Sequence, residues 1–178
     1  SWTGDLSIDG RPNVGGREHR HKAVTPGYFE AAGIRLVRGR DFNESDLSGA
    51  PTAIVNQTFA RLYFAGIDPL GQRIAFPRPT ADARWRTIVG VVADEKQDGL
   101  GVDVKPEVYD PHVEDAPTTM SIVVRTSADP RSAVAAVRRE VAALDPAIAI
   151  YDLRTLEEVV HRSLAEKRFT LATLGAFA

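Results

Sequence analysis

A short helix is predicted by VTPGYFEAAGIRLVRGRDF, the stretch from Val24 to Phe42. Thr25 belongs to the residue types that cap helices, and Pro26 suits the first helical position, where its missing amide proton would have no partner. Gly33 suits the left-handed conformation in which many helices end. The stretch therefore predicts a helix that begins at Pro26 and ends at Gly33.

Both flanks of this helix have the composition of strands. Residues 20–25 are compatible with an extended strand. On the other side, Ile34 and Leu36 alternate with Arg35 before Gly39, which is typical of a strand with one buried face. The helix and its flanks together predict a β-α-β unit.

The same order recurs near the C-terminal end. Residues 120–126, MSIVVRT, are rich in β-branched side chains and predict a strand. Asp129 and Pro130 then give a helix start, an Asp-Pro pair at 145–146 ends it, and AIAIYDL at 147–153 predicts a further strand. The helix would present one apolar face, formed by Val134, Val137, Val141 and Leu144.

Two β-α-β units commonly share one sheet in a ferredoxin-like arrangement. The predicted fold class is therefore α+β, with one lobe built from both units. The sequence between them is dominated by strands, which indicates an inserted smaller lobe. Its signals are strands at 53–56, 73–76, 85–94 and 107–109, and a helix capped by Asn56.

The last predicted helix begins with a capping box, in which Thr155 and Glu158 can each accept a hydrogen bond from the other's backbone amide. Residues 169–178, FTLATLGAFA, then carry no charge. No stretch reaches the ~18–20 apolar residues that span a bilayer, but this end has the composition of a truncated transmembrane helix. One apolar stripe precedes it, made of Leu153, Leu156, Val160 and Leu164.

The composition is that of a globular protein, with 43% hydrophobic and 26% charged residues in a chain of 178. The formal net charge of −2 gives no basic field that would attract nucleic acid. The absence of cysteine excludes disulfides, zinc-thiolate sites and cysteine nucleophiles. A local run of Arg35, Arg38 and Arg40 is interpreted as a solvated charged edge, because acidic residues surround it: Glu30, Asp41, Glu44 and Asp46.

The four histidines give no complete site. His19 and His21 would share one face of a strand and could bind a metal ion, but no third ligand is placed by the sequence. The alternative is a polar edge strand. His112 and His161 have no partner at motif spacing, which predicts surface positions for both.

The remaining motif searches identify no catalytic or binding site either. Asp94 and Glu95 open a loop that could be misread as a calcium site, but the position that needs a glutamate is Lys105. Gly99 and Gly101 lack the third glycine of a dinucleotide fingerprint. Neither a Walker-type phosphate loop nor a serine nucleophile elbow occurs in the sequence. We therefore assign no catalytic residue, no cofactor and no metal site.

Several ordered stretches nevertheless have a familiar combination of motifs. They are VTPGYFEAAGIRLVRGRDF, AIVNQTFARLYF with IDPLGQRI, IVGVVAD, PEVYDPH and IVVRT. Together they resemble the extracytoplasmic core domain of MacB-like, FtsX-type ABC transporter permeases. The resemblance runs from about Val24 to the C-terminus.

The resemblance implies a domain organisation. The domain of that family stands between the first and second transmembrane helices of a four-helix permease, on the periplasmic side of the inner membrane. It has a porter-like lobe, expected here at 1–51 and 116–155, and an inserted smaller lobe, expected at 52–115. Residues 156–178 would form a stalk helix that leads into a membrane helix, so both termini should lie at the membrane-facing end.

The resemblance also implies a function and partners. A cytoplasmic ABC ATPase would hydrolyse ATP, and this domain would transmit the resulting movement to a periplasmic adaptor protein, an envelope enzyme or the exported substrate. A second permease chain would complete a homodimer. The domain itself would be no enzyme. The alternatives are a small-molecule or peptide binding module with a porter-like fold, and an enzyme whose site the motifs do not reveal.

Overall fold

The computed structural model describes residues 6–11, 19–76, 84–96, 102–111 and 119–161. They form two compact units. Unit 1 takes the described residues within Ser1–Glu95 and Asp103–Val123, and unit 2 takes those within Lys96–Val102 and Val124–Ala178.

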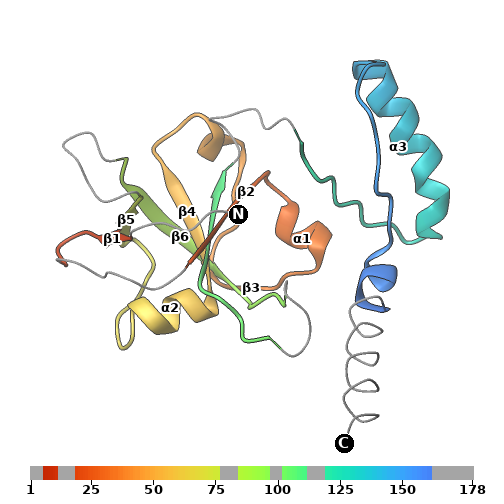
Figure 1. Ribbon diagram of the computed structural model, residues 1–178. Coiled ribbons are helices and arrows are strands. Elements are labelled where there is room, and N and C mark those ends of the chain that lie inside the picture. Colours follow the sequence, from red (N-terminus) through yellow and green to blue (C-terminus); the bar gives the residue numbers. More distant parts are fainter. Residues whose placement is uncertain (1–5, 12–18, 77–83, 97–101, 112–118, 162–178) are drawn as a thin grey trace, which may run out of the picture. The chain divides into compact units, whose positions relative to one another are not determined.

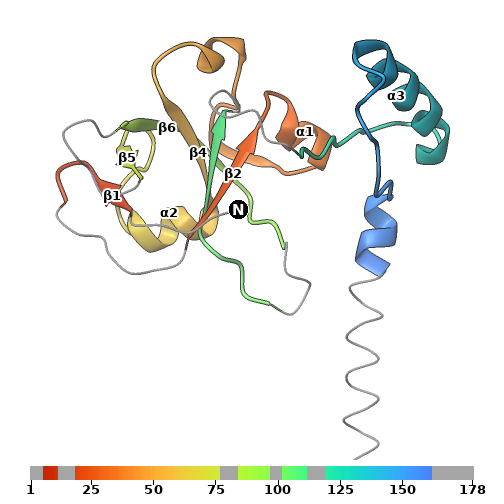
Figure 2. The same ribbon diagram turned by 45° about the horizontal axis from the view of Figure 1, so that its top comes forward.

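Unit 1 is built on a seven-stranded mixed sheet (Figures 1 and 2). The strand order is β1-β5-β6-β4-β7-β2, and β3 also pairs with β6. The pairs β2/β7 and β4/β6 are parallel, whereas the other pairs are antiparallel. The strands are β1 (Ser7–Ile8), β2 (Arg20–Val24), β3 (Leu36–Gly39), β4 (Thr52–Asn56), β5 (Arg73–Ala75), β6 (Arg86–Val92) and β7 (Glu107–Pro111). The helices of unit 1 are α1 (Tyr28–Ala32), η1 (Glu44–Leu47) and α2 (Gln57–Tyr63).

The first predicted β-α-β unit is confirmed as β2, α1 and β3, but the helix begins later than predicted. Residues 25–28 form a turn closed by a hydrogen bond from Tyr28 N to Thr25 O at 3.2 Å. Gly27 has φ 82°, which fits the third position of a type II turn that has proline at its second position. Pro26 therefore shapes the turn rather than the helix. Gly33 ends the helix in the left-handed conformation, as predicted.

The core lies on both faces of the sheet because successive side chains of a strand point in opposite directions. On β4, Ala53 and Val55 join one buried cluster, which α2 covers with Phe59 and Tyr63. Ile54 joins a second buried cluster on the other face, where α1 and the segment after β3 contribute side chains. That second cluster consists of Val24, Phe29, Phe42, Ile54, Val92 and Tyr109.

Unit 2 contains the long helix α3 (Pro130–Leu144). Its predicted start is confirmed, since the Asp129 side chain accepts a hydrogen bond from Arg131 N at 3.0 Å and Pro130 holds the first position. No residue of α3 is buried, and Leu144 is 83% exposed. The apolar face of α3 is thus only partly covered within the part of the chain that the structure describes.

The two strands predicted around α3 are wrong. Residues 120–126 and 147–153 belong to no strand. In the second segment Ala147 lies in a turn and Asp152 has φ 58°, which is outside the extended region. Ile122, Val124 and Ile148 are each more than half exposed. A β-branched pattern makes a strand only when a neighbouring strand takes its backbone hydrogen bonds, and none does so among the described residues.

The α+β fold class is confirmed, since one mixed sheet combines with a few helices. The lobe boundaries stay a prediction. However, the sheet contains three strands from 1–51 and four from 52–115, so these two ranges do not form separate sheets.

The predicted stalk is only partly within the described residues. A helical turn at 156–161 is present, and residues 162–178 lie outside the description. Within the described ranges, we find no helix with the length and apolar character needed to cross a membrane.

Candidate functional site

The two histidines considered as metal ligands are both buried: His19 directly precedes β2, and His21 belongs to it. His19 and His21 lie on the same face, as predicted, with ring centroids 5.3 Å apart, and both rings contact Phe76. His21 is 4% exposed, and its Nδ1 lies 3.1 Å from Asp110 Oδ2. The other oxygen of that carboxylate, Oδ1, lies 2.8 Å from Arg86 Nε.

The outcome of this prediction is mixed. β2 ends the strand order of the sheet, which agrees with the edge strand proposed as the alternative to a metal site. The histidines are not a polar surface, however, because the segment around Phe76 covers them. No group of three or more potential metal ligands occurs among the residues that the structure describes.

A second polar cluster surrounds Lys22, which alternates with His21 along β2. Lys22 Nζ donates to Tyr28 Oη at 3.0 Å and to Glu95 Oε2 at 3.3 Å. It also lies 3.9 Å from Glu107 Oε1, and Tyr109 Oη donates to the other oxygen of Glu107 at 2.9 Å. This cluster connects β2, the start of α1, the segment that follows β6, and β7.

Electrostatics in the Lys22 cluster favour its charged lysine. Burial lowers the pKa of Lys22, but the hydrogen bond to Tyr28 and the charges of Glu95 and Glu107 outweigh it, so that the pKa is raised. Burial and the neighbouring Glu107 carboxylate raise the pKa of Tyr109 far above its usual value. At neutral pH Lys22 is therefore an ammonium, and Tyr28 and Tyr109 are neutral phenols, so the surroundings stabilise the lysine charge.

The Asp94 carboxylate, considered above as part of a loop resembling a calcium site, is hydrogen-bonded to the first turn of α2. It accepts from Thr58 N at 2.8 Å and from Thr58 Oγ1 at 2.9 Å. Arg61 Nη2 donates to the same carboxylate at 2.9 Å. These bonds join the segment that follows β6 to the first turn of α2. The predicted loop glycines Gly99 and Gly101 lie outside the described residues.

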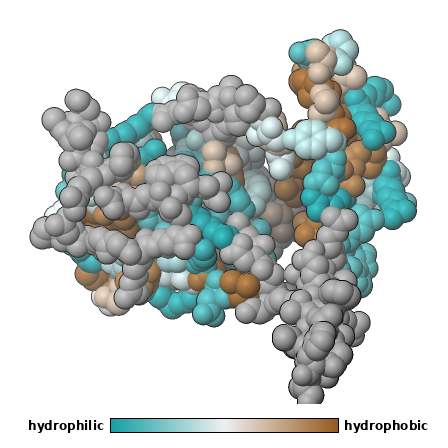
Figure 3. Space-filling view, in the orientation of Figure 1, coloured by the Kyte–Doolittle hydropathy of each residue, from teal (hydrophilic) through white to brown (hydrophobic). Residues whose placement is uncertain are grey.

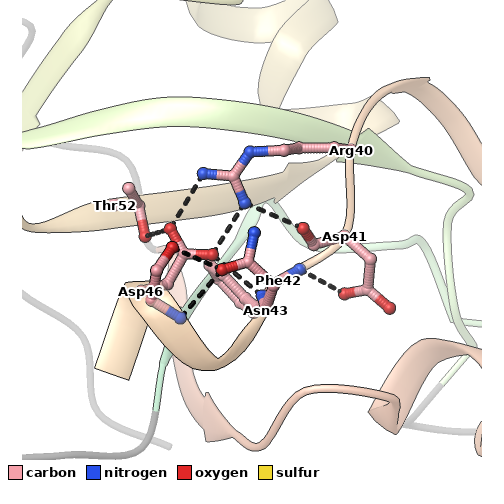
Figure 4. A network of polar contacts seen from close by, with 7 residues as sticks. Arg40, Asp41, Phe42, Asn43, Asp46 and Thr52 are labelled. Carbon is pink, nitrogen blue, oxygen red and sulfur yellow. Dashed lines mark hydrogen bonds and ion pairs between the residues drawn. The ribbon is translucent and has the colours of Figure 1, made fainter. Parts of the chain in front are cut away.

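The charged edge predicted around Arg40 contains a buried carboxylate (Figure 4). Arg40 donates two hydrogen bonds to Asp46, at 2.7 and 2.9 Å. Asn43 N and Thr52 Oγ1 also donate to that carboxylate. These partners, with Arg40 first, lower the pKa of Asp46 to about 2. Asp46 therefore stays ionised and fixes η1 against the beginning of β4.

The surface histidines have different outcomes. His161 is exposed as predicted, and its Nε2 lies 3.7 Å from Glu157 Oε1. His112 lies outside the described residues. Sequence reasoning missed the Lys22 cluster, because only the pairing of β2 with β7 brings Glu107 beside Lys22.

Unit 2 shows a different surface. Apolar side chains gather around α3 and the segment that follows it, residues 145–155, as the brown surface in Figure 3 shows. The large exposed apolar residues of this unit are Val102, Val124, Leu144, Ile148, Tyr151, Leu153, Leu156, Val159 and Val160. A contiguous apolar patch on the surface of a domain is typical of a site that binds a partner.

These features define the class of the protein as a mixed α/β domain whose polar clusters hold its sheet together and whose second unit offers apolar surface. The model of the MacB-like periplasmic core domain matches residues 5–144. The chain belongs to this family, which confirms the resemblance inferred from the sequence.

Solved structures give the same fold. The periplasmic region of MacB from Actinobacillus actinomycetemcomitans has 18% identity and a TM-score of 0.55, covering 80% of this chain and 63% of that structure. A domain of a putative permease protein from Porphyromonas gingivalis has 18% identity and a TM-score of 0.51, covering 79% of this chain and 60% of that structure. The chain thus spans less than two thirds of either structure. A comparison with curated proteins gives no match.

Proposed function

We propose that this chain is the extracytoplasmic domain of an ABC transporter permease that transmits conformational change from a cytoplasmic ATPase to an envelope partner or exported substrate. The observation that carries the proposal is its membership of the MacB-like periplasmic core domain family over residues 5–144. In this proposal the permease lies in the inner membrane, with the chain on the periplasmic side. The ATPase performs the hydrolysis, and the chain catalyses no reaction.

The helix that begins at Leu156 and is described to His161 supports a role as a lever. We call it the terminal helix. From Leu156 to Leu174 the sequence has no glycine or proline, which favours one continuous helix. A continuous helix is stiff, so a displacement at its membrane end would move the other end as well.

The exposed apolar residues of unit 2 support a protein partner. Leu156 is 63% and Val160 is 48% exposed, and four residues along a helix return to the same face. A second permease chain is the partner that we propose for this face, and a periplasmic adaptor protein would bind elsewhere on the domain.

The test uses the full-length transporter with single cysteines in the chain, which has none of its own. Leu156→Cys should react with a maleimide at a different rate in the nucleotide-free state and in the ATP-trapped state. Glu44→Cys, on the exposed surface of unit 1, is the matched control and should react equally in both states. Equal rates at Leu156→Cys in both states would contradict the transmission role.

The homodimer is tested separately. Val160→Cys should form a disulfide between two chains when the membranes are oxidised, whereas Glu44→Cys should remain monomeric. If Val160→Cys forms crosslinks only with another envelope protein, the second permease chain is the wrong partner for this face.

A further inference from the structure

Near the start of the terminal helix of unit 2, the side chain of Glu158 makes two separate polar contacts. The predicted capping box is present: Thr155 N donates to Glu158 Oε2 at 2.9 Å, and Glu158 N donates to Thr155 Oγ1 at 3.1 Å. The first of these bonds uses one oxygen of the Glu158 carboxylate, and the second uses the Glu158 backbone amide. The box satisfies amides that have no partner inside the helix and so fixes the helix start.

The second oxygen of this carboxylate reaches α3. Arg131 Nη2 donates to Glu158 Oε1 at 2.8 Å. Arg131 is the second residue of α3, and its own backbone amide donates to the capping residue Asp129. One carboxylate therefore joins the first turns of two helices, through two residues that are 27 positions apart in sequence.

The charges around this contact agree with the geometry. The hydrogen bond from the Thr155 amide and the one from Arg131 lower the pKa of Glu158. The carboxylate is thus ionised at neutral pH, which is the state that both bonds need.

Apolar packing between the two helices is sparse and does little to fix the angle between them. No residue of α3 is buried, and Leu156 and Val159 on the terminal helix are 63% and 42% exposed. Where buried apolar contacts are few, the relative orientation depends on polar contacts. An exposed ion pair is weak, so this contact can open and close again without unfolding either helix.

We propose that the Glu158 carboxylate is a joint that sets the angle between the terminal helix and α3. Its role in transmission rests on the proposed function, because the joint can transmit a displacement to α3 only if the terminal helix moves. The existence of the joint does not depend on that function. Glu158 and Arg131 are positioning residues in this account.

The joint is tested in the chain of 178 residues with spin labels on cysteines at Ala136→Cys in α3 and His161→Cys in the terminal helix, both of which are exposed sites. The parent should give a narrow distribution of label distances. Arg131→Gln removes the ion pair and leaves the capping box intact. Glu158→Gln keeps the box, since glutamine also serves there, but removes the charge.

Both variants should broaden the distribution and reduce the population at the parent distance about two- to threefold, the size expected for an exposed ion pair. The double variant should broaden it no further, because both changes break the same contact. Arg139→Gln is the matched control, since Arg139 is also on α3 but pairs with its neighbour Glu140. The proposed joint would be contradicted by an unchanged distance distribution in Arg131→Gln and Glu158→Gln, or by the same broadening in Arg139→Gln.

A second measurement separates the joint from the proposed function. In the full-length transporter, Arg131→Gln should lower the amount of substrate moved per ATP hydrolysed, whereas Arg139→Gln should not. If the distances broaden but this ratio is unchanged, the joint exists and its role in transmission is wrong. If neither variant nor deletion of the chain affects transport, the proposed function fails while the distance result stands.

Discussion

At the scale of single residues, two glycines allow β3 and β6 to approach closely. Gly39 and Gly90 are partners in the antiparallel pair. A Cβ on Gly39 would lie 2.2 Å from Val89 O, and a Cβ on Gly90 would lie 2.4 Å from Arg40 O. Real Cβ atoms do not approach backbone oxygens so closely, so neither position can accept a side chain without moving a strand.

Gly39→Ala should therefore destabilise unit 1 more than Gly71→Ala. Both glycines have positive φ, 75° and 78°, but nothing lies within 4 Å of a Cβ on Gly71. Both variants share the conformational cost of about 1 kcal/mol, and the clash at Gly39 should add about 1–3 kcal/mol. Urea denaturation of the two variants measures the difference. Equal losses would show that the approach of β3 to β6 relaxes without cost.

Asp46 should make stability depend on pH in the acid range. Its folded-state pKa of about 2 lies below the ordinary aspartate value of 3.8, so its stabilising effect is complete above about pH 5 and is lost as the pH falls through 2. The shift corresponds to about 2 kcal/mol, which solvent screening at the 46% exposed Arg40 reduces to roughly 1 kcal/mol.

The check is the unfolding free energy of Asp46→Asn between pH 2 and pH 7. The variant should be less stable at pH 7 and should lose less stability on acidification than the parent. Asp68→Asn, which removes an exposed pair with Arg38, is the matched control and should reduce stability at pH 7 by less than Asp46→Asn. A parent profile that is flat between pH 4 and pH 2 would contradict the role of Asp46.

At the scale of elements, Asn56 joins a helix to two strands. It is the last residue of β4 and the cap of α2, where its Oδ1 accepts from Phe59 N at 2.8 Å. The same oxygen accepts from Glu107 N on β7 at 3.0 Å, and Nδ2 donates to Lys105 O at 2.9 Å. The side chain is fully buried, so water cannot replace these bonds.

Asn56→Ala should destabilise unit 1 by about 2–4 kcal/mol, because it removes a cap and leaves buried amides without partners. Asn43→Ala is the matched control, since Asn43 caps η1 at an exposed position and should cost about 1 kcal/mol or less. Thermal unfolding by circular dichroism compares them. Equal losses would mean that the bonds to β7 contribute nothing.

At the scale of the whole molecule, unit 1 buries its apolar side chains on both faces of a sheet, whereas unit 2 leaves many of them exposed. We expect a cysteine at Leu144, which is 83% exposed, to be labelled by a membrane-impermeant maleimide in intact cells with a permeable outer envelope. Labelling that requires lysis of the inner membrane would contradict the periplasmic location.

The sequence by itself determined the local features of this protein. The end of α1 at Gly33, the caps at Asn56 and Asp129 and the Thr155–Glu158 box are all present as predicted. They are readable because a cap or a turn depends on residues only a few positions apart. The sequence motifs also indicated the family correctly, since together they extend over most of the chain.

Only the tertiary structure decided which distant residues meet. The strand order places Glu107 beside Lys22 and Asp110 beside His21, and it covers two histidines that the sequence placed on a polar edge. It also left 120–126 and 147–153 without strand partners in the described part of the chain, although their composition favours strands. The physical reason is that a ladder, a buried charge or a covered face needs a partner from elsewhere in the chain, and local sequence does not specify that partner.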